Sequence, residues 1–398
     1  MSARIPRVAT GLDSWVADGF AVLRGLRVGA IANPTSVDRR IRHVADHLRG
    51  APGVALAALF GPEHGIRADA QDMVGVASGL DARTGVPVHT LYGPTPASLT
   101  PETEQLDDLD ALVFDVQDVG SRYYTFAATM LYAMRAAAPL GLRFFVLDRP
   151  NPIGGLAIEG PTIRPGFESF VGAHPVPIRH GMTVGELARL FVEECALDLD
   201  LTVVPCQGWS RSMGWAETGL PWVLPSPNMP TPDTALVYPG GCLIEGTNLS
   251  EGRGTTRPFE LWGAPWLDPD PLAEPGAWSR GALPRACSFR PTFHKHAGQT
   301  CSGVQPHVED PSSFAPVAFY TAMIAAAREQ HPERFAWRRE SYEFVVEPVA
   351  IDLLFGSDRE RRLIDTGPTP DELEDLRALW SVDEAEFRER RAPFLLYD

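Results

Sequence analysis

Three short stretches of this sequence gather carboxylates that could exchange protons with a substrate and polar or cationic groups that could hold one. The stretch FGPEHG ends an apolar run and presents Glu63 and His64. The stretch DVQDVGSRYY follows another apolar run and contains five candidates: Asp115, Gln117, Asp118, Arg122 and Tyr123. The stretch EGTNLSEGRGTTRPFE carries, among three glycines, Glu245, Asn248, Glu251, Arg253 and Arg257. This pattern is typical of an acid–base site with an anion-binding group.

Each stretch also has a purely structural explanation. His64 could cap a polar turn, and Asp118 could form an ion pair with Arg122 at the start of a helix. The third stretch could be a solvated loop in which the charges balance. The many Trp and Pro residues that precede it favour a ligand site over such a loop.

Short apolar runs alternate with helical patterns over the first 150 residues. The predicted strands are 27–33, 53–60, 87–93, 111–116 and 142–148, and the predicted helices are 38–50 and 124–141. Continuous apolar strands that alternate with helices indicate a parallel sheet covered on both faces. We therefore predict a Rossmann-like, doubly wound and mostly parallel α/β sheet.

Polar residues follow several of these strands directly. In an open α/β sheet the carboxyl ends of the strands share one edge, and ligands bind there. This argument predicts that residues far apart in the sequence meet at one edge: Asn33, Glu63, His64, Asp115, Gln117, Asp118, Asp148 and Arg149.

The rest of the chain contains further α/β patterning around an irregular segment. A helix is predicted over 183–196, with a capping box formed by Thr183 and Glu186. Residues 208–265 are rich in Pro, Gly, Trp and Asn, and 268–278 has the composition of a linker. We predict a Rossmann-like domain over 1–266 and a smaller C-terminal α/β domain over 267–398.

Composition excludes several classes of partner. The net charge of −16 argues against nucleic acid and against an anionic membrane surface. The five cysteines include no C-x-x-C pair, which favours a reducing compartment over a disulfide framework. The first residues lack the apolar core of a signal peptide, so we expect a cytoplasmic protein. Whether the chain forms a homodimer is left open.

No cofactor is predicted from the motifs. The turn after the first strand reads NPTSVD and has no G-x-G-x-x-G, and neither a P-loop nor a G-x-S-x-G is found. The histidines are scattered without an H-E-x-x-H, so we expect no metal.

Several blocks, in order from about residue 27 to residue 308, together resemble the exo-β-N-acetylmuramidases of the NamZ type. They include LFGPEHGIR, DVQDVGSRYYTF, LDRPNPIGG, PSPNMPTPDTALVYPG and EGTNLSEGRGTTRPFE. The resemblance implies a glycoside hydrolase that releases N-acetylmuramic acid from the non-reducing end of peptidoglycan fragments. It also implies an active site in the cleft between the main domain and the C-terminal domain. The stretch after Arg67, ADAQDMVGV, departs from the family pattern.

The resemblance also suggests roles for the candidate residues. Glu63 is the expected general acid, and its partner carboxylate is expected to be Glu251, then Glu245, then Asp115, since glycoside hydrolysis usually uses two carboxyl groups. Arg253 or Arg257 would pair with the lactyl carboxylate of muramic acid. The remaining expected substrate-binding residues are Asn33, His64, Gln117, Asp118, Arg122, Tyr123, Asn228 and Asn248.

The expected substrate is a muropeptide or the disaccharide of N-acetylmuramic acid and N-acetylglucosamine, and the expected process is cell-wall recycling. Two alternatives stay open at this point. The chain could be an exo-glycosidase for another N-acetylated sugar, or a sugar-binding protein without catalytic activity on the same fold.

Overall fold

The computed structural model of the protein describes residues 8–66, 79–368 and 370–398; the departing stretch after Arg67 lies outside them. Its main element is a seven-stranded sheet in the order β3-β4-β2-β1-β5-β6-β7. All neighbouring strands pair in parallel except β3 with β4. The strands are β1 (Arg27–Ala32), β2 (Ala55–Gly61), β3 (Gly79–Leu80), β4 (Pro87–Thr90), β5 (Ala111–Asp115), β6 (Arg143–Leu147) and β7 (Asp200–Val204). The predicted fold class is confirmed.

Helices cover both faces of this sheet. Alternate residues of each strand point to opposite faces, so both faces carry side chains that pack against helices. Leu12, Trp15 and Val44 pack with Val28 on one face. Phe126 and Leu187 pack with residues such as Phe114 in the cluster on the other face. The covering helices are α1 (Gly11–Asp18) and α2 (Val44–Gly50) on the first face, and α4 (Phe126–Ala137) and α5 (Val184–Glu194) on the second.

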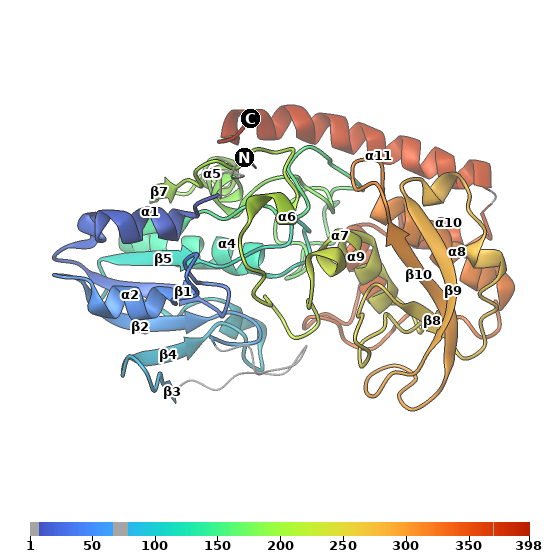
Figure 1. Ribbon diagram of the computed structural model, residues 1–398, viewed down its shortest axis with the longest axis horizontal. Coiled ribbons are helices and arrows are strands. Elements are labelled where there is room, and N and C mark those ends of the chain that lie inside the picture. The colour runs from blue at the N-terminus through green and yellow to red at the C-terminus, as the bar shows by residue number, and fades with distance from the viewer. Residues whose placement is uncertain (1–7, 67–78, 369) are drawn as a thin grey trace, which may run out of the picture.

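A smaller antiparallel sheet lies at the opposite end of the molecule (Figure 1). Its order is β8-β10-β9, and its strands are β8 (Trp262–Ala264), β9 (Ala282–Phe289) and β10 (Cys301–Val308). Helices α7 (Pro232–Gly241), α8 (Pro316–Gln330), α9 (Ala350–Phe355) and α10 (Arg359–Asp365) lie in this half. The division at residue 266 stays a prediction; β8, which precedes it, pairs with β10.

Three predicted segments differ in extent from the elements observed. The helix expected from residue 38 begins only at Val44, because the Asp38 carboxylate accepts N–H bonds from Arg40 and Arg42 and holds a turn. The helix expected over 124–141 spans 126–137, and a 3-10 turn containing Pro139 follows it. The segment 208–265 is not wholly irregular, since it contains α7 and two short elements, α6 (Trp215–Thr218) and β8.

The predicted helix start at Thr183 is confirmed. The Thr183 hydroxyl accepts the N–H of Glu186, and the Glu186 carboxylate accepts the N–H of Thr183. A short helix, α3 (Thr103–Leu106), precedes β5. None of the described helices combines the length and the apolar character needed to cross a bilayer.

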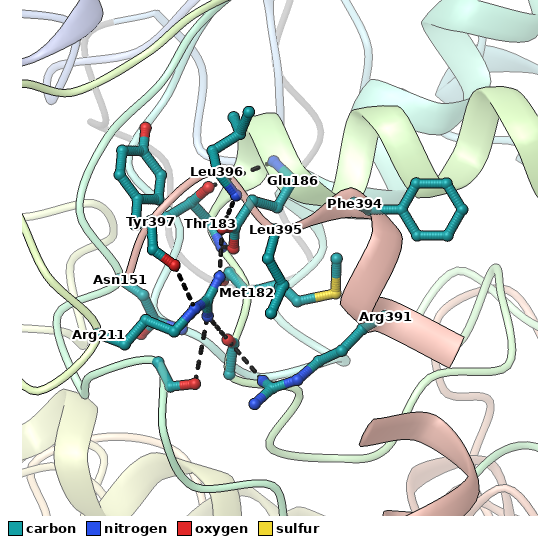
Figure 2. A network of polar contacts seen from close by, with 12 residues as sticks. Asn151, Met182, Thr183, Glu186, Arg211, Arg391, Phe394, Leu395, Leu396 and Tyr397 are labelled. Carbon is teal, nitrogen blue, oxygen red and sulfur yellow. Dashed lines mark hydrogen bonds and ion pairs between the residues drawn. The ribbon is translucent and has the colours of Figure 1, made fainter. Parts of the chain in front are cut away.

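The last helix joins the two halves. α11 (Pro370–Arg391) runs along the upper side of the molecule, from above the small sheet toward the large one, and ends near α5 (Figure 1). The segment after it docks beside α5 through Arg211, which pairs with the buried Glu186 and donates to the carbonyls of Gly181 and Tyr397 (Figure 2). Leu396 N–H donates to the same glutamate at 2.8 Å. These contacts hold both halves in a fixed relation.

Candidate active site

A small pocket is lined by residues of both halves. The large sheet contributes residues that follow β2 and β5, and the other half contributes residues from 226 onward. Six of the predicted site residues line it: Glu63, His64, Tyr123, Asn228, Glu245 and Arg253.

The FGPEHG stretch forms a tight turn that brings Glu63 into this pocket. The N–H of Gly65 donates to the carbonyl of Pro62 at 2.8 Å, and His64 and Gly65 have φ of 69° and 79°. The Glu63 side chain is 6% exposed. Its Oε2 accepts the hydroxyl of Thr125 at 2.8 Å, whereas its buried Oε1 has no hydrogen-bond partner among the residues that the structure describes. A buried acceptor without a partner is costly, so Oε1 is the atom of Glu63 left for a ligand.

Thr125 holds Glu63 instead of capping its own helix. It occupies the N-cap position of α4, but its side chain makes no capping bond there. The residue follows the DVQDVGSRYY stretch directly, and the strand β5 delivers that stretch to the sheet edge. Two sequence motifs thus meet through one hydrogen bond.

Glu245 is held in quite different surroundings. Its Oε1 accepts from Arg253 Nη2 at 2.6 Å, and its Oε2 accepts the hydroxyl of Tyr342 at 2.7 Å. The Arg253 guanidinium also lies over the ring of Phe259, 5.1 Å from its centre. Glu245 therefore has a cationic partner, whereas the donor to Glu63 seen in the described part of the chain is the neutral hydroxyl of Thr125.

Glu251 does not line the pocket. Its carboxylate is fully buried and forms ion pairs with Lys295 at 2.9 Å, with His294 at 2.8 Å and with Arg253 at 3.3 Å. Burial alone would raise the pKa of Glu251, but these cationic partners, Lys295 foremost, hold it well below its usual range. The geometry gives Glu251 the position of a support for Arg253.

Unusual backbone conformations concentrate around the pocket. Nine described residues other than glycine have positive φ. Of these, His64, Phe259 and Glu343 line the pocket, and Phe344 follows Glu343 directly. Such conformations cost free energy and persist where the surrounding structure enforces them, which is common at functional sites.

The other predicted residues after β1 and β5 lie outside this pocket. Asp115 pairs with Arg149 at 2.6 Å, and burial raises the pKa of Asp115 despite that cation. Asn33 is buried and accepts from Thr35. Gln117 donates to two carbonyls and, with Arg149, lines a second cavity of about 320 Å³. These residues brace the sheet edge beside the pocket.

Four more predicted residues also have structural partners. Burial raises the pKa of Asp118 to about 7, and this carboxyl accepts the N–H of Gly120. Arg122 does not form the expected ion pair with Asp118; it donates to the carbonyls of Pro161 and Val176. The other two residues are Asn248 and Arg257. Asn248 forms hydrogen bonds with the backbone of residues 334 and 336, and Arg257 pairs with Glu260.

The pocket also contains residues that the sequence analysis did not identify: Tyr124, Thr125, Ser226, Tyr238, Tyr342 and Glu343. Thr125 adjoins a predicted motif and could have been found by extending it. Glu343 stands in the charged stretch RRESYEF, which has no feature of a site. Only the folding of the second half against the first brings it here.

The described residues contain no group of three or more His, Cys, Asp or Glu side chains placed to hold a metal ion. The pocket presents two carboxyl groups: Glu63, which accepts from the neutral hydroxyl of Thr125, and Glu245, which accepts from the cation Arg253. Two carboxyl groups in unlike surroundings can divide the roles of acid and base.

Comparison with known proteins identifies the family of the chain. Residues 28–233 match the family model for the N-terminal part of exo-β-N-acetylmuramidase NamZ, and residues 236–397 match the model for its C-terminal part. The chain is 45% identical to the peptidoglycan β-N-acetylmuramidase NamZ of Bacillus subtilis, over 100% of this chain and 93% of that protein.

Two solved structures of DUF1343 family proteins from Bacteroides fragilis are similar in fold. The first has a TM-score of 0.89 and 34% sequence identity and covers 100% of both chains. The second has a TM-score of 0.72 and 29% identity and covers 99% of both chains.

Proposed function

The chain belongs to the exo-β-N-acetylmuramidase NamZ family, and from this we propose that it is a glycoside hydrolase that acts on peptidoglycan fragments. It would release N-acetylmuramic acid from their non-reducing end. The observation that carries the proposal is the buried Oε1 of Glu63, which lies on a pocket shared by both halves and has no hydrogen-bond partner within residues 8–66, 79–368 and 370–398.

Glu63 is the proposed general acid. Its Oε1 would hold the proton that passes to the glycosidic oxygen as the bond to muramic acid breaks. The Thr125 hydroxyl on Oε2 supports this role, because it fixes the orientation of the carboxyl group and can stabilise the anion left after proton transfer.

Glu245 is the proposed partner carboxylate. It lines the pocket with Glu63, and its bonds from Arg253 and Tyr342 fix its orientation. A carboxylate oriented in this way can act on the sugar carbon or activate a water molecule. Glu251 and Asp115, the other candidates, do not line the pocket. Glu251 is paired with Lys295, and Asp115 is paired with Arg149.

Arg253 is the proposed reader of the lactyl carboxylate. Its guanidinium is a buried cation on the pocket wall, and a cation is the partner that a carboxylate of the substrate needs. Arg257 is less suited, because it pairs with Glu260 and its side chain is 44% exposed. His64, Tyr123 and Asn228 line the same pocket and would contact the sugar.

The experiment is hydrolysis of two substrates by the full chain: the disaccharide of N-acetylmuramic acid and N-acetylglucosamine, and an aryl muramic acid glycoside. Wild-type protein should hydrolyse both. Glu63→Gln keeps the shape of the side chain but has no proton to give, so turnover of the disaccharide should fall roughly 10²–10⁴-fold. The aryl glycoside, whose leaving group needs less protonation, should be affected less.

Glu159→Gln is the matched control, since Glu159 is a buried glutamate outside the pocket lining. This variant should keep its activity. A wild-type protein that binds muramic acid without turnover would favour the sugar-binding alternative. Faster turnover of glycosides of other N-acetylated sugars than of muramic acid glycosides would favour the alternative of an exo-glycosidase for another sugar.

Peptidoglycan recycling in the cytoplasm is the proposed process. Its support is that all five cysteines, Cys195, Cys206, Cys242, Cys287 and Cys301, are free, as expected in a reducing compartment. Fractionation of cells that express the chain would test the location, and recovery in an oxidising compartment would contradict it.

A further inference from the structure

The turn that carries Glu343 has a backbone conformation unfavourable for its sequence. Tyr342 and Val345 exchange both backbone hydrogen bonds, at 2.8 and 2.9 Å, so Glu343 and Phe344 form a two-residue turn. Both central residues have positive φ, 45° and 69°, which is the pattern of a type I′ turn. This turn strongly prefers Asn-Gly, yet the chain places Glu-Phe there.

Contacts from both halves enforce this conformation. Tyr92, which follows β4 of the large sheet, donates its hydroxyl to Glu343 Oε2 at 3.0 Å. The ring of Phe344 lies 5.7 Å from the ring of Tyr92, and the adjacent Tyr342 donates to Glu245. The side chains of Tyr342, Glu343 and Phe344 therefore all make contacts at or beside the pocket.

The turn places Glu343 on the pocket wall. Its side chain is 5% exposed and lines the same pocket as Glu63, Glu245 and Arg253. A carboxylate has several acceptor positions, so one on a pocket wall can accept hydrogen bonds from a ligand as well as the bond from Tyr92. Because unfavourable backbone persists where side chains are needed for function, the Glu343 carboxylate is the feature that this turn serves.

We propose that Glu343 is a substrate-binding residue whose carboxylate accepts hydrogen bonds from the 4- or 6-hydroxyl of the terminal muramic acid. This rests on the proposed function. The lactyl carboxylate at position 3 would be repelled by Glu343 and belongs with the cation Arg253. Position 1, where the glycosidic bond breaks, would lie beside Glu63. The acetamido N–H at position 2 lies between positions 1 and 3, so the hydroxyls at positions 4 and 6 are the donors on the rest of the sugar that an anionic acceptor can bind.

The 4-hydroxyl exists only at the non-reducing end, because an internal muramic acid carries a glycosidic bond at that oxygen. A carboxylate that accepts from this hydroxyl would therefore favour a terminal sugar over an internal one. A site that hydrogen-bonds a substrate hydroxyl discriminates against analogues that lack it, since that hydrogen bond is then lost. Glu343 would thereby contribute to the choice of chain ends.

The test uses Glu343→Asn and Glu343→Gln in the full chain. Asn suits the backbone of the turn but is too short to reach as glutamate does, so Glu343→Asn should fold and should lower kcat/KM on the disaccharide roughly 10- to 100-fold, mainly through KM. Gln keeps the length and an acceptor oxygen and should lose less. Ala196→Asn is the matched control: Ala196 is exposed, has φ of 50° and follows α5, away from the pocket.

Analogues of the disaccharide that lack the 4- or the 6-hydroxyl of muramic acid decide the assignment. In wild-type protein at least one analogue should react roughly 10- to 100-fold more slowly, and in Glu343→Asn the same analogue should differ little from the parent. Equal losses in both proteins for both analogues would overturn the proposal. So would a loss of kcat above about 10³-fold in Glu343→Gln with KM unchanged, because Glu343 would then take part in the chemical step.

A wild-type protein without any hydrolytic activity would contradict the proposed function but not this assignment. Calorimetric binding of free N-acetylmuramic acid and of its two deoxy analogues would then serve as the readout. Glu343→Asn should abolish the preference for the parent sugar over at least one analogue. An unchanged preference would refute the role of Glu343.

Discussion

Replacing Thr125 by valine should slow the hydrolysis of the disaccharide without unfolding the protein. Valine has nearly the shape of threonine, and the substitution removes only the hydroxyl that donates to Glu63 Oε2 at 2.8 Å. If Glu63 is a general acid, this bond is between neutral groups before the reaction and becomes charge-assisted as the proton leaves. A neutral bond contributes about 1 kcal/mol and one to a charged group about 1.5–3 kcal/mol, so the difference of roughly 0.5–2 kcal/mol predicts a rate about 2- to 30-fold lower.

The assay compares kcat on the disaccharide with kcat on an aryl muramic acid glycoside. The aryl leaving group needs less proton transfer, so its hydrolysis should depend less on Thr125. Thr129→Val is the matched control on the same helix, because the Thr129 hydroxyl is also buried but donates to the backbone carbonyl of Thr125. The helix cap is unaffected in both variants, since Thr125 makes no side-chain capping bond. Equal slowing of both substrates in Thr125→Val, or wild-type rates on the disaccharide, would refute the reasoning.

Three further predictions concern charge and stability. Arg253→Ala should narrow the preference for muramic acid over N-acetylglucosamine glycosides by roughly 10- to 100-fold, the worth of a charge-assisted pair, while Arg257→Ala should retain it; unchanged discrimination in both would show that neither arginine reads the lactyl group. Burial raises the pKa of Asp118 to about 7, so the unfolded chain releases this proton first, near pH 4, and the stability that the group contributes at low pH is lost as the pH rises toward 7. The Asp118→Asn variant cannot titrate at this position. Relative to wild type, its free energy of unfolding, measured by urea denaturation, should therefore rise by roughly 4 kcal/mol from pH 4 to pH 7. Parallel plots of the free energy of unfolding against pH for the two proteins would contradict this. Arg211→Met leaves Glu186 buried without a counter-charge and should cost about 3–5 kcal/mol, most of which the double variant with Glu186→Gln should restore; a single variant as stable as wild type would be the opposite result.

The sequence alone was sufficient for the fold class and for naming Glu63, which the structure places on the pocket. The strands β1, β2, β5 and β6 have continuous apolar runs because both faces of the sheet are covered, and such runs are visible without a structure. The capping box at Thr183 and Glu186 was likewise readable, because it depends on residues three apart. Glu63 was identifiable because it directly follows a buried strand at the edge where such sheets bind ligands.

Other features depended on the competition between neighbouring charges. The stretch from Glu245 to Arg257 contains two glutamates and two arginines, and their order in the sequence does not say which pair forms. Arg253 joins Glu245 and Glu251, whereas Arg257 turns outward to Glu260. Lys295 and His294, from the loop between β9 and β10, then neutralise Glu251. The first-ranked partner carboxylate thus lies behind the pocket wall, and Glu245 lies on it.

Only the tertiary structure brought Glu343 to the pocket. Its hydrogen bond joins it to Tyr92, 251 positions earlier in the chain, and no local pattern encodes a contact of that range. Strand periodicity, capping boxes and strand-end motifs are determined by neighbours within a few residues, so the sequence by itself determined them. The pocket depends instead on how α11 and the segment after it hold the second half against the first, and that arrangement is decided by packing between surfaces whose residues are scattered along the whole chain.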